Sequence, residues 1–419
     1  MSILVILFTT ILVSAFIKNN INMKFTNSLC IIFSCVYLSF SLNNELFLFQ
    51  ASNFAVLIGN LLTIACVIFI YEININNIKG IKNYIWITLI MAFAISLYES
   101  CCQTFLVGIF LTVILRIVTN NEKENVLIKY LLKNIMVLAL AIIVNYAILE
   151  LLFLIGVPSE LGGKTIYWFQ YGIKDGLMVI LSSIVKYIFR NIKYFPVLEF
   201  VVCIILCEII SIIYSINKKN INIFNLTNIL IFSNVAISVI QCKTILYRTC
   251  LSWNLVVAAT VTVLYCIVRK NKIIKNIITI FIVILICWQT RDLNQWFYSD
   301  YLKYQKDLND AFTIADDIRK VASDTNKPIV FVGTPNDGFQ MEGQIGSQSN
   351  GLSVIWWGEK AFDDNSYELI KFINSLGYNF KKPTDEQYKE GQEKTNDMST
   401  FPKEGYIKEL EDIIIVKFK

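Results

Sequence analysis

The sequence predicts an all-α polytopic membrane bundle of about ten spans, followed by a small C-terminal α/β domain. Of 419 residues, 55% are hydrophobic and 16% are charged, whereas about 25% are charged in a typical soluble domain. Apolar runs of roughly 15 to 25 residues recur, close to the length that a helix needs to cross about 30 Å of hydrocarbon. Near residue 290 the composition becomes polar.

The apolar runs are expected to be helices, because lipid offers the backbone no hydrogen-bond partner and a helix satisfies its own polar groups. The predicted transmembrane domain covers residues 1–289. Its spans lie near residues 3–17, 27–42, 53–71, 83–98, 101–118, 130–156, 194–215, 226–242, 250–268 and 273–289.

Basic residues fall in alternate loops between these runs. These loops contain Lys18, Lys79, Lys123, Lys218 and Arg269. Short cytoplasmic loops are enriched in lysine and arginine, so these loops are expected on the cytoplasmic side. The loop "SLNNELFLFQAS" and the turn at Tyr98 contain no basic residue and are expected on the outer side.

The stretch "GLMVILSSIVKYIFRNIKYF" (176–195) has two interpretations. As an eleventh span it would place Lys218 and Arg269 outside. Its spaced basic residues instead favour an amphipathic helix on the outer surface. Residues 156–193 are therefore predicted to be an outer re-entrant or interfacial region.

This orientation makes the first span run from outside to inside. Either Met1 is translocated without a signal, or an upstream span and outer loop are missing from this chain. We expect the second.

Residues 290–419 are predicted to form an extracytoplasmic α/β domain. It begins with apolar residues at helical spacing, namely Tyr304, Leu308, Phe312, Ala315, Ile318 and Ala322. A strand-like "PIVFVG" (328–333), helices near 365–376 and 384–396, and a final strand "DIIIVKFK" follow. The domain contains no glycine-rich phosphate loop.

Composition argues against several function classes. The chain has no histidine, which disfavours zinc sites and histidine-based triads. Most of its 11 cysteines lie in apolar runs and are expected to be small buried hydrophobes. Asp316 and Asp317 should point to different faces of one helix and form a solvated surface. No metal, cofactor or nucleic-acid partner is expected.

Polar residues at the outer ends of spans are functional candidates, because a charge at the bilayer centre costs about 2.5–3.5 kcal/mol on insertion scales. Glu99 and Glu45 are the candidate catalytic carboxylates, with solvated surface caps as the alternative. Lys243 and Arg248 lie in a short outer loop, where positive residues are scarce. They suit a donor phosphate, with lipid headgroup contact as the alternative.

Aromatic and amide side chains accompany these charges. Tyr98, Trp168, Gln170 and Tyr171 are candidates for sugar or acceptor binding. The alternative for Trp168 and Tyr171 is an anchoring role at the membrane interface, where tryptophan and tyrosine concentrate.

Taken together, the polar outer face, the aromatic loop and the C-terminal domain suit chemistry at the bilayer surface. The matching substrate has a lipid tail, a phosphate and a polar head, as in a sugar linked to a polyprenyl phosphate. One carboxylate would act as general base on an acceptor hydroxyl, and basic groups would stabilise the departing phosphate.

Several segments resemble the GtrII-like membrane glucosyltransferases of bacteria, which modify O-antigen and related surface polysaccharides. They are "SLYESCCQTFL" (96–106), "NNELFLFQASNFAVLIGNLL" (43–62), "YWFQYGI" (167–173), "LYRTCLSWN" (246–254) and the ending "YIKELEDIIIVKFK". The resemblance implies a GT-C type fold in the plasma membrane. It also implies an undecaprenyl-phosphate-linked glucose or similar donor, and transfer to a polysaccharide on the outer leaflet.

The chain departs from that family in two ways. It begins too late to contain the large acidic outer loop that the family places after its first span, and Glu99 stands where the family element has glutamine. Either the protein is N-terminally incomplete, or Glu45 or Glu99 has taken the base role. A transporter or flippase for lipid-linked saccharides and a noncatalytic assembly partner are the alternatives. A transporter should show inverted repeats and broken helices, and the sequence indicates neither.

Overall fold

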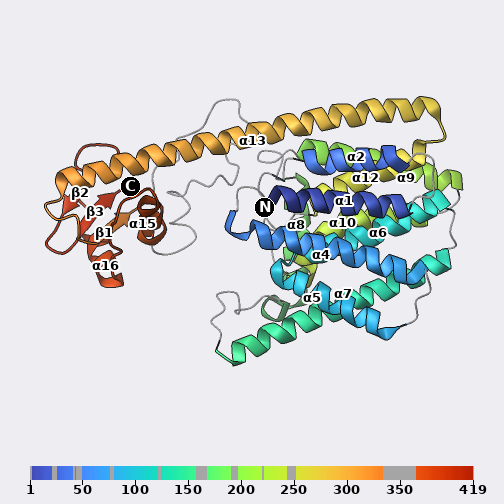
Figure 1. Cartoon of the computed structure of the whole chain (residues 1–419), viewed down its shortest axis with the longest axis horizontal. Coiled ribbons are helices and arrows are strands. Elements are labelled where there is room, and N and C mark those ends of the chain that lie inside the picture. The colour runs from blue at the N-terminus through green and yellow to red at the C-terminus, as the bar shows by residue number, and fades with distance from the viewer. Residues whose placement is uncertain are drawn as a thin grey trace. The chain divides into compact units, whose positions relative to one another are not determined.

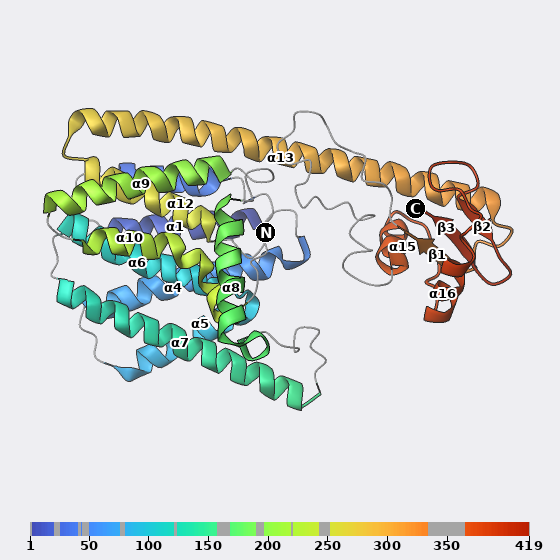
Figure 2. The same cartoon turned by 180° about the vertical axis from the view of Figure 1, so that it is seen from behind.

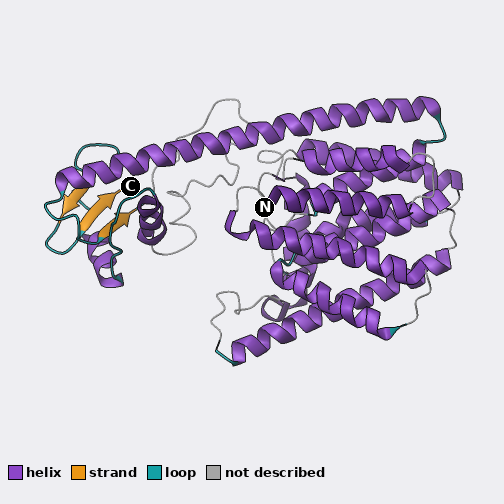
Figure 3. Ribbon diagram, in the orientation of Figure 1, coloured by secondary structure: helices purple, strands orange, loops and turns teal. Residues whose placement is uncertain are grey.

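The computed structural model describes residues 2–20, 26–40, 43, 50–75, 80–120, 124–156, 168–189, 197–218, 221–242, 252–333 and 365–418. The chain divides into two compact units, Met1–Leu293 and Asn294–Lys419. The first is helical and the second contains a small sheet (Figures 1 and 3).

The helices of the first unit follow the apolar runs closely. They are α1 (Ser2–Asn20), α2 (Thr26–Ser39), α4 (Gln50–Ile75), α5 (Ile81–Leu97), α6 (Cys101–Asn120), α7 (Glu124–Leu154), α8 (Trp168–Phe189), α9 (Val197–Lys218), α10 (Asn222–Phe232), α11 (Ala236–Gln241), α12 (Trp253–Val268) and the start of α13 (Lys272–Val321). Six segments among the described residues are long and apolar enough to cross a membrane. The chain is therefore a multi-pass membrane protein; ten spans remain a prediction.

Apart from α8, successive spans of the bundle run in opposite directions, with α10 and α11 counted as one span (Figure 1). The two ends of the bundle differ in charge. The C-terminal ends of α1, α9 and α12 gather at one end, and α6 begins at the opposite one (Figure 1). Lys18 and Lys218 lie in the last turns of α1 and α9, and Arg269 follows α12. We call this the basic end, and the other the turn end, after the tight turn Tyr98–Ser100.

Two helices form the centre of the bundle. Of the 16 residues of α12, all but Ile267 are buried, as expected for a helix that is apolar all round. It packs against α2, α6 and α9. In the apolar stretch of α6, 78% of the residues are buried. The corresponding share is 22% in the apolar stretches of α7 and α13. The apolar segments of α7 and α13 therefore have exposed outward faces, as expected of helices on the outside of a membrane bundle.

Small residues let α4 approach its neighbours closely. A Cβ placed on Gly59 would lie 2.9 Å from the Cys101 Sγ, and one on Gly108 would lie 2.9 Å from a Cγ of Val67. Between these two contacts the Thr104 hydroxyl donates to Asn60 Oδ1 over 3.0 Å. Close backbone approach and interhelical hydrogen bonds are the interactions that associate helices in lipid.

Helix α8 runs across the ends of the other helices (Figure 2). Gly172, with φ of +70°, interrupts its first turn. Its apolar side chains point mostly outward, with Ile173, Leu177 and Leu181 all more than half exposed. An exposed apolar stripe of this kind suits a helix immersed in the membrane surface. The interfacial position itself remains a prediction.

One span is interrupted, which the sequence did not indicate. The apolar segment Asn222–Gln241 consists of α10, a 3-10 turn at Ser233–Val235, and α11. Short 3-10 stretches within a helix mark hinges or local strain. The φ/ψ angles at Phe232, Ser233, Val235 and Ala236 stay in the right-handed helical region, so the segment continues as one candidate span through this turn.

The second unit packs helices on both faces of a three-stranded sheet. Strand β3 (Ile414–Lys417) lies between β1 (Ile329–Val332), to which it is parallel, and β2 (Ile407–Glu409), to which it is antiparallel. Successive side chains of a strand alternate between faces. Phe331 accordingly packs with α13 and α15 (Asn365–Ser375), whereas Val330 faces α16 (Asp385–Glu393) through Gly391. A small sheet near the C-terminus was predicted and is present.

The predicted apolar stripe of α13 enters this core in part, because Ala315 and Ile318 are fully buried and Ala322 packs against the core. Ala311, Ile314 and Ile318 are fully buried, whereas Tyr304 and Phe312 remain 44% and 42% exposed. The buried face of the helix is therefore turned from Tyr304 and Phe312 towards the smaller Ala311 and Ile314.

A partly buried ion pair closes this unit. The Lys327 ammonium lies 2.7 Å from the Glu409 carboxylate, which also accepts hydrogen bonds from the backbone N–H and hydroxyl of Ser323. These partners favour the ionised carboxylate and lower the pKa of Glu409 from 4.5 to about 2.

We expect the Gly108→Leu variant to lower the melting temperature, because its side chain would push Val67 away from α6. Overpacking of this kind costs about 1–3 kcal/mol. Unfolding can be followed by the reaction of the buried Cys101 and Cys102 thiols with a maleimide dye. Gly80→Leu is the control, because the nearest atom to its Cβ is an Asn83 amide nitrogen at 3.5 Å. Equal melting temperatures for the two variants would contradict the close packing of α4 and α6.

The second unit should lose stability as the pH falls from about 4.5 towards 2. The pKa of Glu409 is lower in the folded unit than in the unfolded chain, so its contribution is complete above pH 4.5 and disappears as the folded carboxylate gains a proton. Pepsin digestion of the full chain across this range measures the effect. Glu409→Gln should be cleaved faster already at pH 4.5 and should change less with pH. The exposed Glu404→Gln control should behave like the wild type.

Candidate functional site

The turn between α5 and α6 presents a carboxylate at the turn end of the bundle. Tyr98 is extended, and the backbone N–H groups of Cys101 and Cys102 bond back to the carbonyls of Tyr98 and Glu99, each over 3.1 Å. These bonds close the turn within three residues. Glu99 is exposed, whereas Ser100 beside it is fully buried. The turn therefore holds the Glu99 carboxylate outward on a fixed backbone.

Beneath the turn lies a set of three residues that we call the Gln103 cluster: Gln103, Asn234 and Ser252. The Gln103 amide donates to the Asn234 backbone carbonyl over 2.5 Å, and its oxygen accepts from the Ser252 hydroxyl over 3.1 Å. Ser252 also contacts Asn234 Oδ1. All three are buried, and they join α6, the interrupted span and the start of α12.

The Gln103 cluster contains more hydrogen-bonding atoms than its members satisfy among themselves. The Ser252 hydroxyl has one proton for two amide oxygens. Within the part of the chain that the structure describes, Ser100 Oγ, Ser238 Oγ and Asn234 Nδ2 are buried without a hydrogen-bond partner. Buried polar groups without partners are costly and mark strained or functional positions. Of these atoms only Asn234 Nδ2 belongs to the Gln103 cluster, and the opposite orientation of the Asn234 amide would direct it at the Ser252 hydroxyl oxygen.

A second polar set, which we call the Gln289 cluster, begins at Asn254 of α12, two residues after Ser252. Asn254 donates to Asn43 Oδ1 over 2.9 Å, and Asn43 donates to the Tyr37 carbonyl at the end of α2. From the same end of α2, the Ser39 hydroxyl donates to Gln289 Oε1 of α13 over 2.8 Å. The cluster comprises Ser39, Asn43, Asn254 and Gln289.

Asp292 lies one helical turn beyond Gln289 and was missed by sequence reasoning. It is 1% exposed, and the neighbouring Arg291 binds its Oδ1 at 2.8 Å. The bundle-facing residues of α13 include Ile278, Leu285, Gln289 and Asp292, so this face becomes polar at the turn end. In the sequence, Gln289 and Asp292 continue the spacing of the buried apolar residues of α13. This spacing is the signal that indicates a buried position.

The predicted site residues are placed unequally. Glu99 is exposed at the turn, Tyr98 is half-buried beside it, and Tyr171 is 46% exposed on α8. Trp168 and Gln170 lie in the first turn of α8, where the structure describes the backbone only. Glu45, Lys243 and Arg248 lie outside the described residues. Their roles therefore remain predictions.

Three other acidic residues have partners close to them in the structure. Glu208, within α9, accepts from the Asn228 amide over 3.2 Å. Asp317 accepts from the Tyr406 hydroxyl at 2.9 Å and pairs with Lys320, whereas Asp316 accepts from Tyr378. Asp316 and Asp317 thus have separate partners. Among the described residues no group of acidic and cysteine side chains could hold a metal ion.

No protein-family model matches the chain, and neither the curated proteins nor the solved structures contain a match to it.

Replacing Gln103 with leucine should destabilise the bundle by about 1–3 kcal/mol, because it removes two hydrogen bonds and leaves buried partners unsatisfied. A double-mutant cycle with Ser252→Ala should show a coupling energy of about 0.5–3 kcal/mol. Thermal unfolding in detergent supplies the free energies. Thr227→Val is the control partner, because the Thr227 hydroxyl donates within its own helix, α10. The changes in unfolding free energy caused by Thr227→Val and by Gln103→Leu should therefore add in the double variant. Additive effects for Ser252→Ala would disprove the cluster.

Proposed function

We propose that the chain is a membrane glycosyltransferase of GT-C-like fold. It transfers glucose or a similar sugar from a polyprenyl-phosphate donor to a cell-surface polysaccharide on the outer face of the plasma membrane. The observation that supports this most is the exposed Glu99 carboxylate, held on a rigid turn above a buried polar cluster at the end of the bundle opposite the basic loops. In this proposal the turn end and the C-terminal unit are extracytoplasmic.

The chemistry assigns separate roles to the polar groups. The Glu99 carboxylate accepts the proton of the acceptor hydroxyl as its oxygen bonds to the anomeric carbon of the sugar. The bond from that carbon to the phosphate oxygen breaks, and polyprenyl phosphate leaves with the electron pair. Arg248 and Lys243 stabilise the negative charge that develops on the leaving phosphate. Tyr98, Trp168, Gln170 and Tyr171 bind the sugar or acceptor, and Glu45 is the second candidate base.

The setting of Glu99 is suited to this role. A catalytic group must be held in position by neighbours whose own geometry is fixed. The turn is closed by backbone hydrogen bonds on one side. On the other, Gln103 ties the first turn of α6 to two further elements. The Gln103 cluster thereby acts as a positioning device, and Glu99 remains free to meet a substrate at the membrane surface.

A transporter for lipid-linked saccharides is the second candidate, favoured by one observation. The span Asn222–Gln241 contains a 3-10 turn at Ser233–Val235, and helices with local irregularities build the substrate sites of many transporters. The two functions predict different products. A transferase releases polyprenyl phosphate, whereas a transporter moves the intact lipid-linked sugar between leaflets. An assay for both in the same vesicles distinguishes them.

Glu99→Gln should reduce sugar transfer at least ~100-fold, the lower end of what a general base contributes, while leaving donor binding unchanged. Transfer of labelled glucose from undecaprenyl phosphate by the full chain in vesicles measures the rate. The exposed Glu150→Gln in α7 is the matched control and should retain wild-type activity. An active Glu99→Gln enzyme would remove the base assignment. Arg248→Ala should raise the KM for the donor.

A further inference from the structure

One ionisable side chain lies in the middle of a membrane span. Glu208 stands near the centre of α9, which begins at Val197 and ends at Lys218, so it is about 15 Å from either end of the helix at 1.5 Å per residue. The segment around it, Phe200–Lys218, is apolar and long enough to cross a membrane. Ionisable groups at such a depth are costly and rare, and they mark functional positions.

The partner of Glu208 is an amide and not a cation. Asn228 of α10 donates to Oε2 of Glu208 over 3.2 Å and to the Phe224 carbonyl over 3.0 Å, so both hydrogens of its amide are used. One neutral hydrogen bond does not replace the hydration of an ionised carboxylate, and a buried carboxyl without a paired cation takes up a proton instead.

The helices that pack on α9 supply no opposite charge. They are α10 and α12, and neither contains a charged residue. The titratable side chains of α12 are Tyr265 and Cys266, which lie within one turn of Arg269 at the basic end. On α9 itself, Cys207 bonds to a carbonyl of α12, and Tyr214 lies further towards the basic end. These helices thus give Glu208 no cation to pair with.

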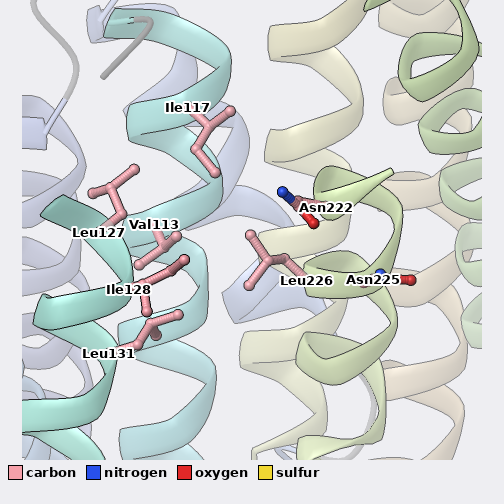
Figure 4. Close-up of a pocket in the computed structure, with 8 residues that line it drawn as sticks. All are labelled: Val113, Ile117, Leu127, Ile128, Leu131, Asn222, Asn225 and Leu226. Carbon is pink, nitrogen blue, oxygen red and sulfur yellow. The ribbon is translucent and has the colours of Figure 1, made fainter. Parts of the chain in front are cut away.

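A row of asparagines on α10 leads from the basic end to Glu208. Asn222, Asn225 and Asn228 are three residues apart, so they follow one side of the helix over about 9 Å. Asn222 and Asn225 are exposed, and they line a cavity of about 160 Å³ on the wall opposite α6 and α7 (Figure 4). Asn228 lines a second cavity, of about 420 Å³. Either cavity is large enough for water, and these amides supply the hydrogen-bond partners that water needs.

We propose that Glu208 is a proton-binding site within the membrane, and that it exchanges its proton with water at the basic end along these three asparagines. The carboxylate takes the proton from water and becomes a neutral acid, which Asn228 holds at the contact between α9 and α10. Loss of the proton leaves a charge without a counter-ion, so this helix contact depends on protonation. Carboxyl groups of this kind relay protons in pumps and transporters. The site is separate from the proposed transfer reaction and does not depend on it.

The test is reaction with dicyclohexylcarbodiimide, an apolar reagent that dissolves in the bilayer. The carboxyl proton passes to a nitrogen of the reagent while the carboxyl oxygen bonds to its central carbon, and the adduct rearranges to a stable N-acylurea without a further reactant. The full chain in phosphatidylcholine vesicles is treated at about pH 7.5, where an exposed glutamate is ionised and reacts poorly. Mass spectrometry of the α9 peptide should show one added reagent on Glu208.

Four variants identify the cause of the labelling. Glu208→Gln should abolish it. Asn228→Lys places an ammonium beside the carboxylate, which favours the ionised form, and should reduce labelling at least ~10-fold. Asn228→Leu introduces no charge and should be labelled as the wild type is, which separates the effect of charge from the loss of the amide. Glu150→Gln, at an exposed position of α7, is the matched control and should leave the labelling of Glu208 unchanged.

Infrared spectroscopy measures the exchange. The C=O stretch of the protonated carboxyl should be absent from Glu208→Gln and should shift when wild-type vesicles are transferred to D₂O. Replacing both Asn222 and Asn225 with leucine should slow that shift. An unlabelled wild type, or equal labelling of the wild type and Asn228→Lys, would overturn the proton-binding site. A shift that is equally fast in the double leucine variant would overturn the path along α10.

Discussion

The rest of the bundle depends on one constraint, which is that polar groups removed from water into an apolar assembly must find partners within the protein. The first turn of α12 is where this constraint acts most strongly. Ser252 joins Gln103 and Asn234, and two residues later Asn254 joins Asn43. Through these contacts α12 is tied to α2, α6 and the interrupted span. Lipid supplies no hydrophobic force between helices, so such bonds and the close contacts at Gly59 and Gly108 specify the arrangement.

The same constraint shapes the segment between α10 and α11. At the 3-10 turn Ser233–Val235, the Asn234 carbonyl accepts from the Gln103 amide, and the Asn234 side-chain oxygen contacts the Ser252 hydroxyl. Nearby, Asn228 donates to Glu208 of α9 and Ser233 donates to the Ile229 carbonyl of its own helix. These polar groups of the segment are therefore paired within the protein.

Sequence reasoning was most successful where composition decides structure. The prediction of an apolar helical membrane protein with a small sheet near the C-terminus is confirmed. Its failures concern the direction of particular side chains. Of the apolar stripe predicted on α13, Ala315 and Ile318 lie in the core, whereas Tyr304 and Phe312 are more than 40% exposed and Ala311 and Ile314 are buried. Asp292 was missed, because a carboxylate at the end of an apolar run is equally compatible with water and with the bundle. The partners of Asn234 in the 3-10 turn are Gln103 and Ser252, which no local pattern encodes.

The sequence by itself determined which segments are helices in lipid, because long apolar runs can satisfy their backbone only internally. It also determined the short turn at Tyr98–Ser100, where two runs meet with almost no residues between them. Only the tertiary structure decided which polar side chains face inward. Glu99 and Gln103 are four residues apart, and one is exposed whereas the other is fully buried. Partners on α12 and the interrupted span, more than a hundred residues away, supply the hydrogen bonds that make burial of Gln103 favourable.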